Sequence, residues 1–218
     1  MHGPIGKKML DGLQEYGLQG LAFFSCGFRN VFTKGVAVMS PGDLKGMKIR
    51  VTASPVMIDS LNSMGASATP LSASELFQSL KTGVVDGAEN NPVTFVSDKY
   101  YEAGCDHFCM TGHFANQHFM VANKKWLAKV AQEHPDLHEL ILKAPAAIMD
   151  EYQRRWDVSE KAAMQEIKDV GVTIVTENEV DKAAFVKTVE TVIDDFFKKN
   201  PDVDREYITL IREAAKSE

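Results

Sequence analysis

The chain has 218 residues and a mass of 24.1 kDa, which is enough for one large domain or two small lobes. Hydrophobic residues make up 44% of it and charged residues 25%, so disordered and fibrous classes are excluded. No stretch approaches the roughly 18 consecutive apolar residues of a membrane span. The formal net charge is −6 and there is no basic run, which argues against a nucleic-acid partner.

The first half of the sequence predicts alternating helices and strands. The expected elements, in chain order, are a helix over 6–16, a buried strand over 21–24, a strand over 47–51, helices over 54–65 and 72–83, and a strand over 84–87. Gly27 is expected to break the first strand. Ser54-Pro55 and a capping box at Ser72–Glu75 mark the two helix starts. This order is typical of an α/β protein with a largely parallel sheet.

The second half is richer in helix. The expected elements are a short helix over 124–130, a long helix over 146–170, a strand over 172–175 and helices over 180–198 and 204–216. Pro145 starts or kinks the long helix, which at 1.5 Å per residue is about 40 Å long. Such a helix suits a strut between two lobes, and a plain packing helix fits the pattern equally well.

Neither the cysteines nor the N-terminus identifies a compartment. Cys26, Cys105 and Cys109 are too few, and odd in number, for a disulfide scaffold. The first residues have no apolar stretch and no small-residue cleavage site, so we expect them to be the middle of a domain rather than a signal peptide.

Arg50, Arg29 and Asn90 are the candidate ligand-binding residues. Arg50 lies near the carboxyl end of a predicted strand, where α/β sheets bind ligands, and its planar fork can hold a carboxylate by two parallel hydrogen bonds. Arg29 and Asn90 each follow a predicted strand and are placed to reach the same cleft. By spacing alone, surface arginines and an Asx turn are the more common roles for such residues.

Metal binding and nucleophilic catalysis have little support. His134 and His138 are four apart, but Pro135 intervenes and the sequence lacks the H-E-x-x-H pattern. A second group of metal-capable residues has no recognised zinc spacing: Cys105, His107, Cys109 and His113. No nucleophile elbow, P-loop or dinucleotide-binding glycine motif is present. We therefore expect no cofactor and no resident metal.

Taken in order, several segments resemble the solute-binding proteins of tripartite ATP-independent periplasmic (TRAP) transporters, of the DctP type. Each segment alone is weak, and the ordered set is specific. The matching segments are Gly27-Phe28-Arg29, residues 41–51 (PGDLKGMKIRV), Met64-Gly65-Ala66 with Thr69-Pro70, and residues 74–92 (SELFQSLKTGVVDGAENNP).

The resemblance implies a two-lobed α/β binding protein with a long interlobe helix. Residues 1–27 and 116–155 are then the remainder of lobe I with the start of that helix, and 28–115 and 156–218 are lobe II with the C-terminal helices. Family members begin with a signal peptide and further elements of the first lobe, which have no counterpart in this sequence. Two expectations stay open: the sequence is a fragment of a longer protein, or the first lobe is incomplete and leaves sheet edges unpaired. In addition, Ala73 stands where many members have an aromatic residue, which is expected to change the pocket.

The resemblance also implies a function and a role for each candidate residue. Arg50 corresponds to the family's carboxylate anchor, Arg29 to an assisting arginine and Asn90 to a pocket asparagine. The implied function is extracytoplasmic, in the periplasm: the protein captures a small organic acid and delivers it to the membrane subunits of a TRAP transporter, without chemistry. Two alternatives stay open, namely a hydrolase or lyase that clamps an organic acid with the same arginines, and a truncated remnant that binds nothing.

Overall fold

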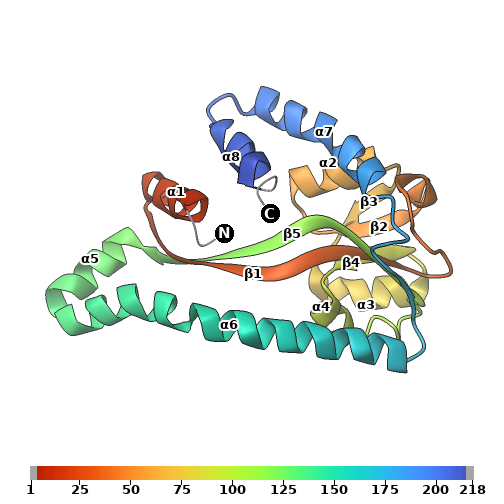
Figure 1. Ribbon diagram of the computed structural model, residues 1–218, viewed down its shortest axis with the longest axis horizontal. Helices are drawn as coiled ribbons and strands as arrows, with labels where there is room; N and C mark the ends of the chain where they lie inside the picture. Colours follow the sequence, from red (N-terminus) through yellow and green to blue (C-terminus); the bar gives the residue numbers. More distant parts are fainter. Residues whose placement is uncertain (1–3, 215–218) are drawn as a thin grey trace. The chain divides into compact units, whose positions relative to one another are not determined.

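The computed structural model describes residues 4–214, which form a mixed α/β fold with one six-stranded sheet (Figure 1). The helices are α1 Pro4–Gly12, α2 Pro55–Ser63, α3 Ala73–Thr82, α4 Pro92–Ser97, α5 Lys124–Glu133, α6 Pro135–Asp169, α7 Lys182–Lys199 and α8 Glu206–Ala214, with 3-10 turns at Leu13–Tyr16 and Pro41–Leu44. The strands are β1 Leu18–Thr33, β2 Lys48–Val51, β3 Ser67–Pro70, β4 Gly87–Asn90, β5 His107–Asn123 and β6 Thr173–Val175. The predicted α/β class is confirmed.

The sheet has the strand order β3-β2-β4-β1-β5-β6. Strand β2 runs parallel to both β3 and β4, and β6 runs parallel to β5, whereas β1 is antiparallel to β4. The sheet is therefore mixed: three of these four pairings are parallel, in line with the predicted largely parallel sheet, and one is antiparallel. The parallel half, β3-β2-β4, is connected through α2 and α3, as parallel strands require a crossover.

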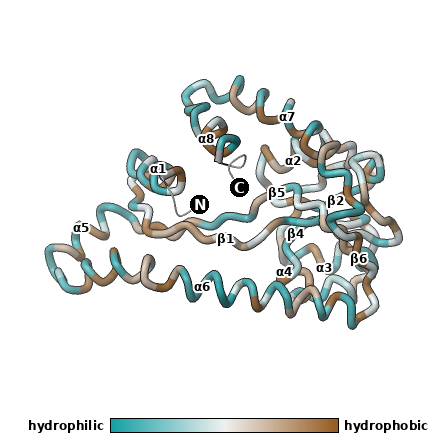
Figure 2. Tube along the Cα trace, viewed as in Figure 1, coloured by the Kyte–Doolittle hydropathy of each residue, from teal (hydrophilic) through white to brown (hydrophobic). Residues whose placement is uncertain are grey.

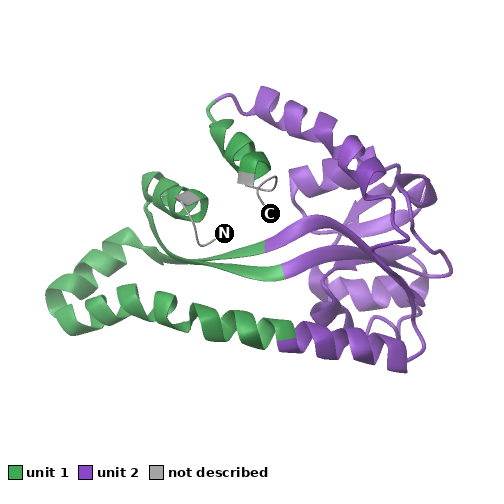
Figure 3. Ribbon diagram, viewed as in Figure 1, with its two compact units in different colours: residues 1–26, 117–157, 202–218 green, residues 27–116, 158–201 purple. Residues whose placement is uncertain are grey.

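The chain divides into two compact units, coloured separately in Figure 3. Unit 1 comprises residues 1–26, 117–157 and 202–218, and unit 2 comprises 27–116 and 158–201. The chain passes from one unit to the other within β1, β5 and α6, so these three elements belong to both.

The C-terminal segment groups differently from the expectation, which placed it in lobe II. Residues 202–218 belong to unit 1. Within that unit the hydroxyl of Tyr207 donates to the carbonyl of Lys8 at 3.3 Å, and the Lys8 ammonium lies 3.4 Å from the Asp204 carboxylate. These contacts join segments about 200 residues apart, which no local pattern reveals.

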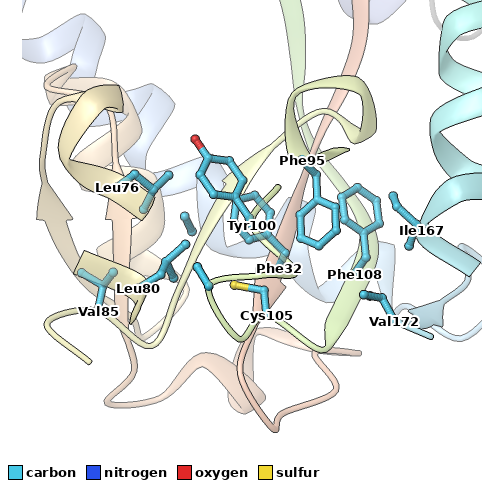
Figure 4. Packing of buried hydrophobic residues seen from close by; sticks show 12 residues of the cluster. Phe32, Leu76, Leu80, Val85, Phe95, Tyr100, Cys105, Phe108, Ile167 and Val172 are labelled. Atoms are coloured by element: carbon cyan, nitrogen blue, oxygen red, sulfur yellow. The ribbon is translucent and has the colours of Figure 1, made fainter. Parts of the chain in front are cut away.

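Unit 2 has two hydrophobic clusters, and the one drawn in Figure 4 is rich in aromatic residues. The ring of Tyr100 stacks on Phe32 with centroids 5.2 Å apart, and Phe95 packs edge-on against both Phe32 and Phe108. Ile167 of α6 completes the cluster and is fully buried. In Figure 2, hydrophobic and hydrophilic residues alternate along α6 and α7, as expected for helices that bury one face.

Two predicted breaks are wrong. Strand β1 continues through Gly27, which adopts a positive φ of 66° that glycine tolerates. Helix α6 begins at Pro135 rather than near residue 146, continues through Pro145 and is 35 residues long, or about 52 Å. Pro145 and Met149 are both buried and lie one turn apart, so packing of this face offsets the backbone hydrogen bond that the proline removes.

The fourth strand is displaced from its predicted position. The apolar residues Val84 and Val85 lie in a turn, and Val84 is 51% exposed, while β4 consists of the polar-looking sequence Gly87–Asn90. This strand lies between β2 and β1, and its Glu89 is fully buried. The prediction also omitted β3, α4 and the 17-residue β5, whose apolar residues are interrupted by polar ones.

Gly87 is required by the close approach of β1. An added Cβ would lie 3.0 Å from Thr33 Cγ2 and would collide with the carbonyl oxygen of Phe32. We expect Gly87→Ala to lower the free energy of unfolding by about 1–3 kcal/mol, as overpacking does. Chemical denaturation checks this, with Gly42→Ala as the control, because a Cβ there meets only the Ser40 hydroxyl at 3.5 Å. Equal stability of the two variants would contradict the argument.

None of the helices within residues 4–214 has the length and apolar character needed to cross a membrane.

Candidate functional site

Arg50 lies on β2 with its guanidinium held inside unit 2. The residue is only 4% exposed, and its Nε and Nη2 groups both donate to the carbonyl of Leu71, at 2.9 and 2.7 Å. Burial lowers the pKa of Arg50 from its ordinary value; the Glu89 carboxylate opposes that shift and the Arg29 charge adds to it. Both bonds use the Nε–Nη2 edge of the guanidinium, and among the described residues no hydrogen bond uses Nη1, so the Nη1–Nη2 edge can pair with a carboxylate.

A cavity of about 560 Å³ adjoins Arg50. It lies at the carboxyl ends of β2 and β3 and at the start of α3, the position at which α/β sheets bind ligands. Its other lining residues are Thr52, Ala53, Pro70, Leu71, Ser72, Ala73 and Glu75. The lining thus combines one buried cation with hydroxyls, a carboxylate and small apolar groups, which suits a polar anion.

The capping box predicted at the start of α3 forms this wall of the cavity. The Glu75 carboxylate accepts from the backbone N–H of Ser72 at 3.1 Å and from its hydroxyl at 2.5 Å. The hydroxyl's hydrogen bond lowers the pKa of Glu75, and the backbone N–H bond lowers it further. Ala73, the first residue of α3, leaves the space in which a larger side chain would project.

Arg29 is engaged in a buried ion pair. Its Nη2 donates to Glu89 Oε1 at 2.8 Å and to the Glu89 carbonyl at 3.0 Å, and its Nε donates to Glu89 Oε2. The Glu89 side chain is fully buried and that of Arg29 is 14% exposed. Burial alone raises the pKa of Glu89, but the hydrogen bonds from Arg29, with a smaller effect of His113, hold it below its ordinary value.

His113 completes this buried polar cluster. Its side chain is fully buried, with Nε2 3.8 Å from Glu89 Oε2 and Nδ1 2.8 Å from the Thr111 hydroxyl. Within residues 4–214, Nε2 has no hydrogen-bond partner. The sequence pattern predicts no role for Glu89 and places His113 only in a weak metal cluster. A glutamate between Gly87-Ala88 and Asn90 is typical of a loop. It can lie in a buried strand here because Arg29 neutralises its charge.

The two candidate arginines lie on opposite faces of the sheet. Arg50 is paired in register with Ala88, so its side chain and that of Asn90 share one face. Val31 is paired with Glu89, so Arg29 and Glu89 share the other face.

The two neighbouring asparagines have different roles: Asn90 is half-buried with a donor group left over, and Asn91 caps a helix. The Asn90 side-chain oxygen accepts from the N–H of Asn91 at 2.9 Å, which leaves its NH₂ group as a donor. Asn91 caps α4 by accepting from the N–H of Thr94 at 2.8 Å. The Asx role expected from the sequence therefore belongs to Asn91, while Asn90 lies beside the Arg50 face.

In the part of the chain that the structure describes, no three or more histidine, cysteine, aspartate or glutamate side chains are grouped to hold a metal ion. Cys105 precedes β5 and lies in the aromatic cluster, whereas Cys109 of β5 lies in the other hydrophobic cluster of unit 2. Cys105 and Cys109 are buried thiols, and burial raises their pKa values, to about 12 and about 11.

The sequence matches a known protein family. Residues 1–200 match the model of the bacterial extracellular solute-binding protein, family 7. A solute-binding protein of Chromohalobacter salexigens is 32% identical over 216 residues, which cover 98% of this chain and 62% of that protein. The C4-dicarboxylate-binding periplasmic protein DctP of Rhodobacter capsulatus is 30% identical over 193 residues, covering 88% and 56%. The chain thus spans less than two thirds of these relatives.

Solved structures of the same family are similar to this chain. A TRAP periplasmic solute-binding protein of Chromohalobacter salexigens with bound D-glucuronate is similar with a TM-score of 0.88 and 31% identity, over 97% of this chain and 68% of that one. A TRAP periplasmic solute-binding protein of Citrobacter koseri, also with D-glucuronate, has a TM-score of 0.78 and 36% identity, over 92% and 65%.

Proposed function

This chain belongs to family 7 of the bacterial extracellular solute-binding proteins, and on that premise we propose that it captures a hexuronate in the periplasm and delivers it to a TRAP-type membrane transporter. The observation that carries the proposal is the buried guanidinium of Arg50, held by the Leu71 carbonyl beside a cavity of about 560 Å³. A preorganised arginine fork is the group that best recognises a carboxylate.

The choice of a sugar acid rests on the lining and on the neighbours. A hexuronate carries one carboxylate and several hydroxyls, and the cavity offers Thr52, Ser72 and Glu75 as hydrogen-bonding partners near Arg50. The Chromohalobacter and Citrobacter proteins hold D-glucuronate, and a related protein of a Sulfitobacter species holds β-D-galacturonate. The small Ala73 leaves room for a ring.

Arg29 and Asn90 have supporting roles in this proposal. Arg29 acts indirectly: it holds the buried Glu89 carboxylate by hydrogen bonds from two of its nitrogens. The charges of both groups reach Arg50, where Glu89 raises the pKa and Arg29 lowers it by a smaller amount. Asn90 supplies an amide donor on the same face as Arg50. The transporter's membrane subunits are the expected partner of the loaded protein.

A thermal-shift screen tests the proposal, with D-glucuronate, D-galacturonate and succinate as ligands. A ligand at 100 times its dissociation constant stabilises the folded state by about 2.7 kcal/mol, and we expect this from a hexuronate and not from succinate. Chromatography of the bound fraction should return the acid unchanged, whereas turnover would favour a hydrolase or lyase. No shift with any acid would support a non-binding remnant and contradict the proposal.

A further inference from the structure

A second cavity in unit 2 shares no lining residue with the Arg50 cavity. Its volume is about 390 Å³, within the roughly 300–1,000 Å³ range of small-molecule sites. It lies where β6 ends: β6 pairs with β5 only from His107 to Cys109, and the cavity begins at Met110 of β5. Helix α6 forms the opposite wall, and every lining residue belongs to unit 2.

Part of the lining is apolar and adaptable. Phe28 lies within β1 and lines the cavity. The residue is 57% exposed, which is unusual for a large aromatic residue in a strand of the sheet. Met110 and Met164 are half-buried and pack against the aromatic core of unit 2. Thioethers adjust to irregular ligands and make favourable contacts with aromatic rings. This part of the lining therefore fits an apolar group of a ligand, preferably an aromatic ring.

The rim carries three lysines and two carboxylates, Glu160 and Glu177, so lysines outnumber acids at the cavity. Lys161 and Lys168 flank Met164 at i, i+3 and i+7, so α6 presents all three to one side. Among the described residues, Lys161 and Lys168 make no ion pair. The third rim lysine, Lys182, lies 2.6 Å from the Glu177 carboxylate and is thereby neutralised.

We propose that this cavity binds an aromatic monocarboxylate, with the ring between Phe28 and the two methionines and the carboxylate at Lys161 and Lys168. Such a ligand matches both the apolar and the charged part of the lining. Its ring would stack on the exposed phenylalanine, and its carboxylate would lie between the two lysines. The two cavities share no lining residue, so we expect the two ligands to contact different side chains.

Isothermal titration of this chain with 3-phenylpropionate, in saturating D-glucuronate, tests the site. We expect one-to-one binding with a dissociation constant below about 1 mM, weakened about tenfold by Lys161→Gln with Lys168→Gln and about fivefold by Phe28→Ala. Lys187→Gln, which removes an exposed lysine from α7 outside the cavity, should leave the affinity within about twofold.

Three outcomes would overturn the proposal. These are no heat of binding, an affinity that the lysine and phenylalanine variants leave unchanged, and competition by D-glucuronate, which would place the ligand at Arg50. Arg50→Lys separates this test from that of the main pocket, because it should weaken glucuronate binding and leave phenylpropionate binding intact. If the hexuronate proposal fails, phenylpropionate binding without glucuronate still tests this cavity.

Discussion

Arg50→Lys is expected to weaken binding of D-glucuronate by about a hundredfold or more, because a bidentate charge-assisted contact is replaced by a single ammonium. The arginine's Nε and Nη2 are held by the Leu71 carbonyl, which aims the remaining edge of the fork at the cavity. A lysine carries the same charge but has one nitrogen, which cannot bond to Leu71 and to both carboxylate oxygens with the same geometry. Isothermal titration measures the change.

The control for Arg50 is Arg154→Lys, which makes the same chemical change at an exposed arginine paired with Glu151. It should leave the glucuronate affinity within about twofold. Thermal denaturation without ligand must show that Arg50→Lys remains folded, since Arg50 is buried. A folded Arg50→Lys variant with affinity within threefold of the natural protein would contradict the carboxylate-anchor role.

Glu89→Gln is expected to lower the free energy of unfolding by about 3–5 kcal/mol, because it leaves the guanidinium of Arg29 without its carboxylate partner inside the protein. Glu89 is fully buried and receives hydrogen bonds from Nε and Nη2 of Arg29. Glu102→Gln is the matched control, since its partner Lys99 lies 3.0 Å away but both side chains are exposed. That variant should cost less than about 1 kcal/mol.

The effect of Glu89→Gln should depend on pH in a defined direction. The folded pKa of Glu89 is held below its ordinary value. The carboxylate therefore contributes stability that is fully present above the unfolded value, about 4.3, and is lost as pH falls through the lower folded value. Denaturation of the natural protein and the variant between pH 7 and pH 3 should show curves that converge toward acid. A constant difference, or equal stability at pH 7, would contradict the ion-pair account.

Local signals predicted much of the parallel half of unit 2. The proline at the start of α2, the capping box of α3 and the left-handed Gly83 that ends it all lie where the pattern placed them. Caps and helix stops depend on residues within one turn, so short segments suffice to locate them. The alternation of residues 47–51 likewise predicted β2 and placed Arg50 near its carboxyl end.

Elements that depend on distant partners were misplaced. β4 was predicted at Val84–Gly87 because valines favour strands, but the observed strand begins at Gly87 and contains a buried acid. A glutamate belongs in a central strand only when a cation on the neighbouring strand neutralises it. That cation, Arg29, is 60 residues away in sequence. Similarly, Pro145 stays inside α6 because its face is buried, a condition that no local rule contains.

The sequence by itself determined the α/β class, most helix boundaries, the family resemblance and the candidates Arg50, Arg29 and Asn90. Only the tertiary structure decided that Arg50 donates to the Leu71 carbonyl beside a cavity, and that Arg29 is paired with Glu89 on the opposite face of the sheet. It also decided that residues 202–218 group with unit 1. The division follows from range: propensity and capping act over a few residues, whereas burial and charge pairing act between segments that only the folded chain brings together.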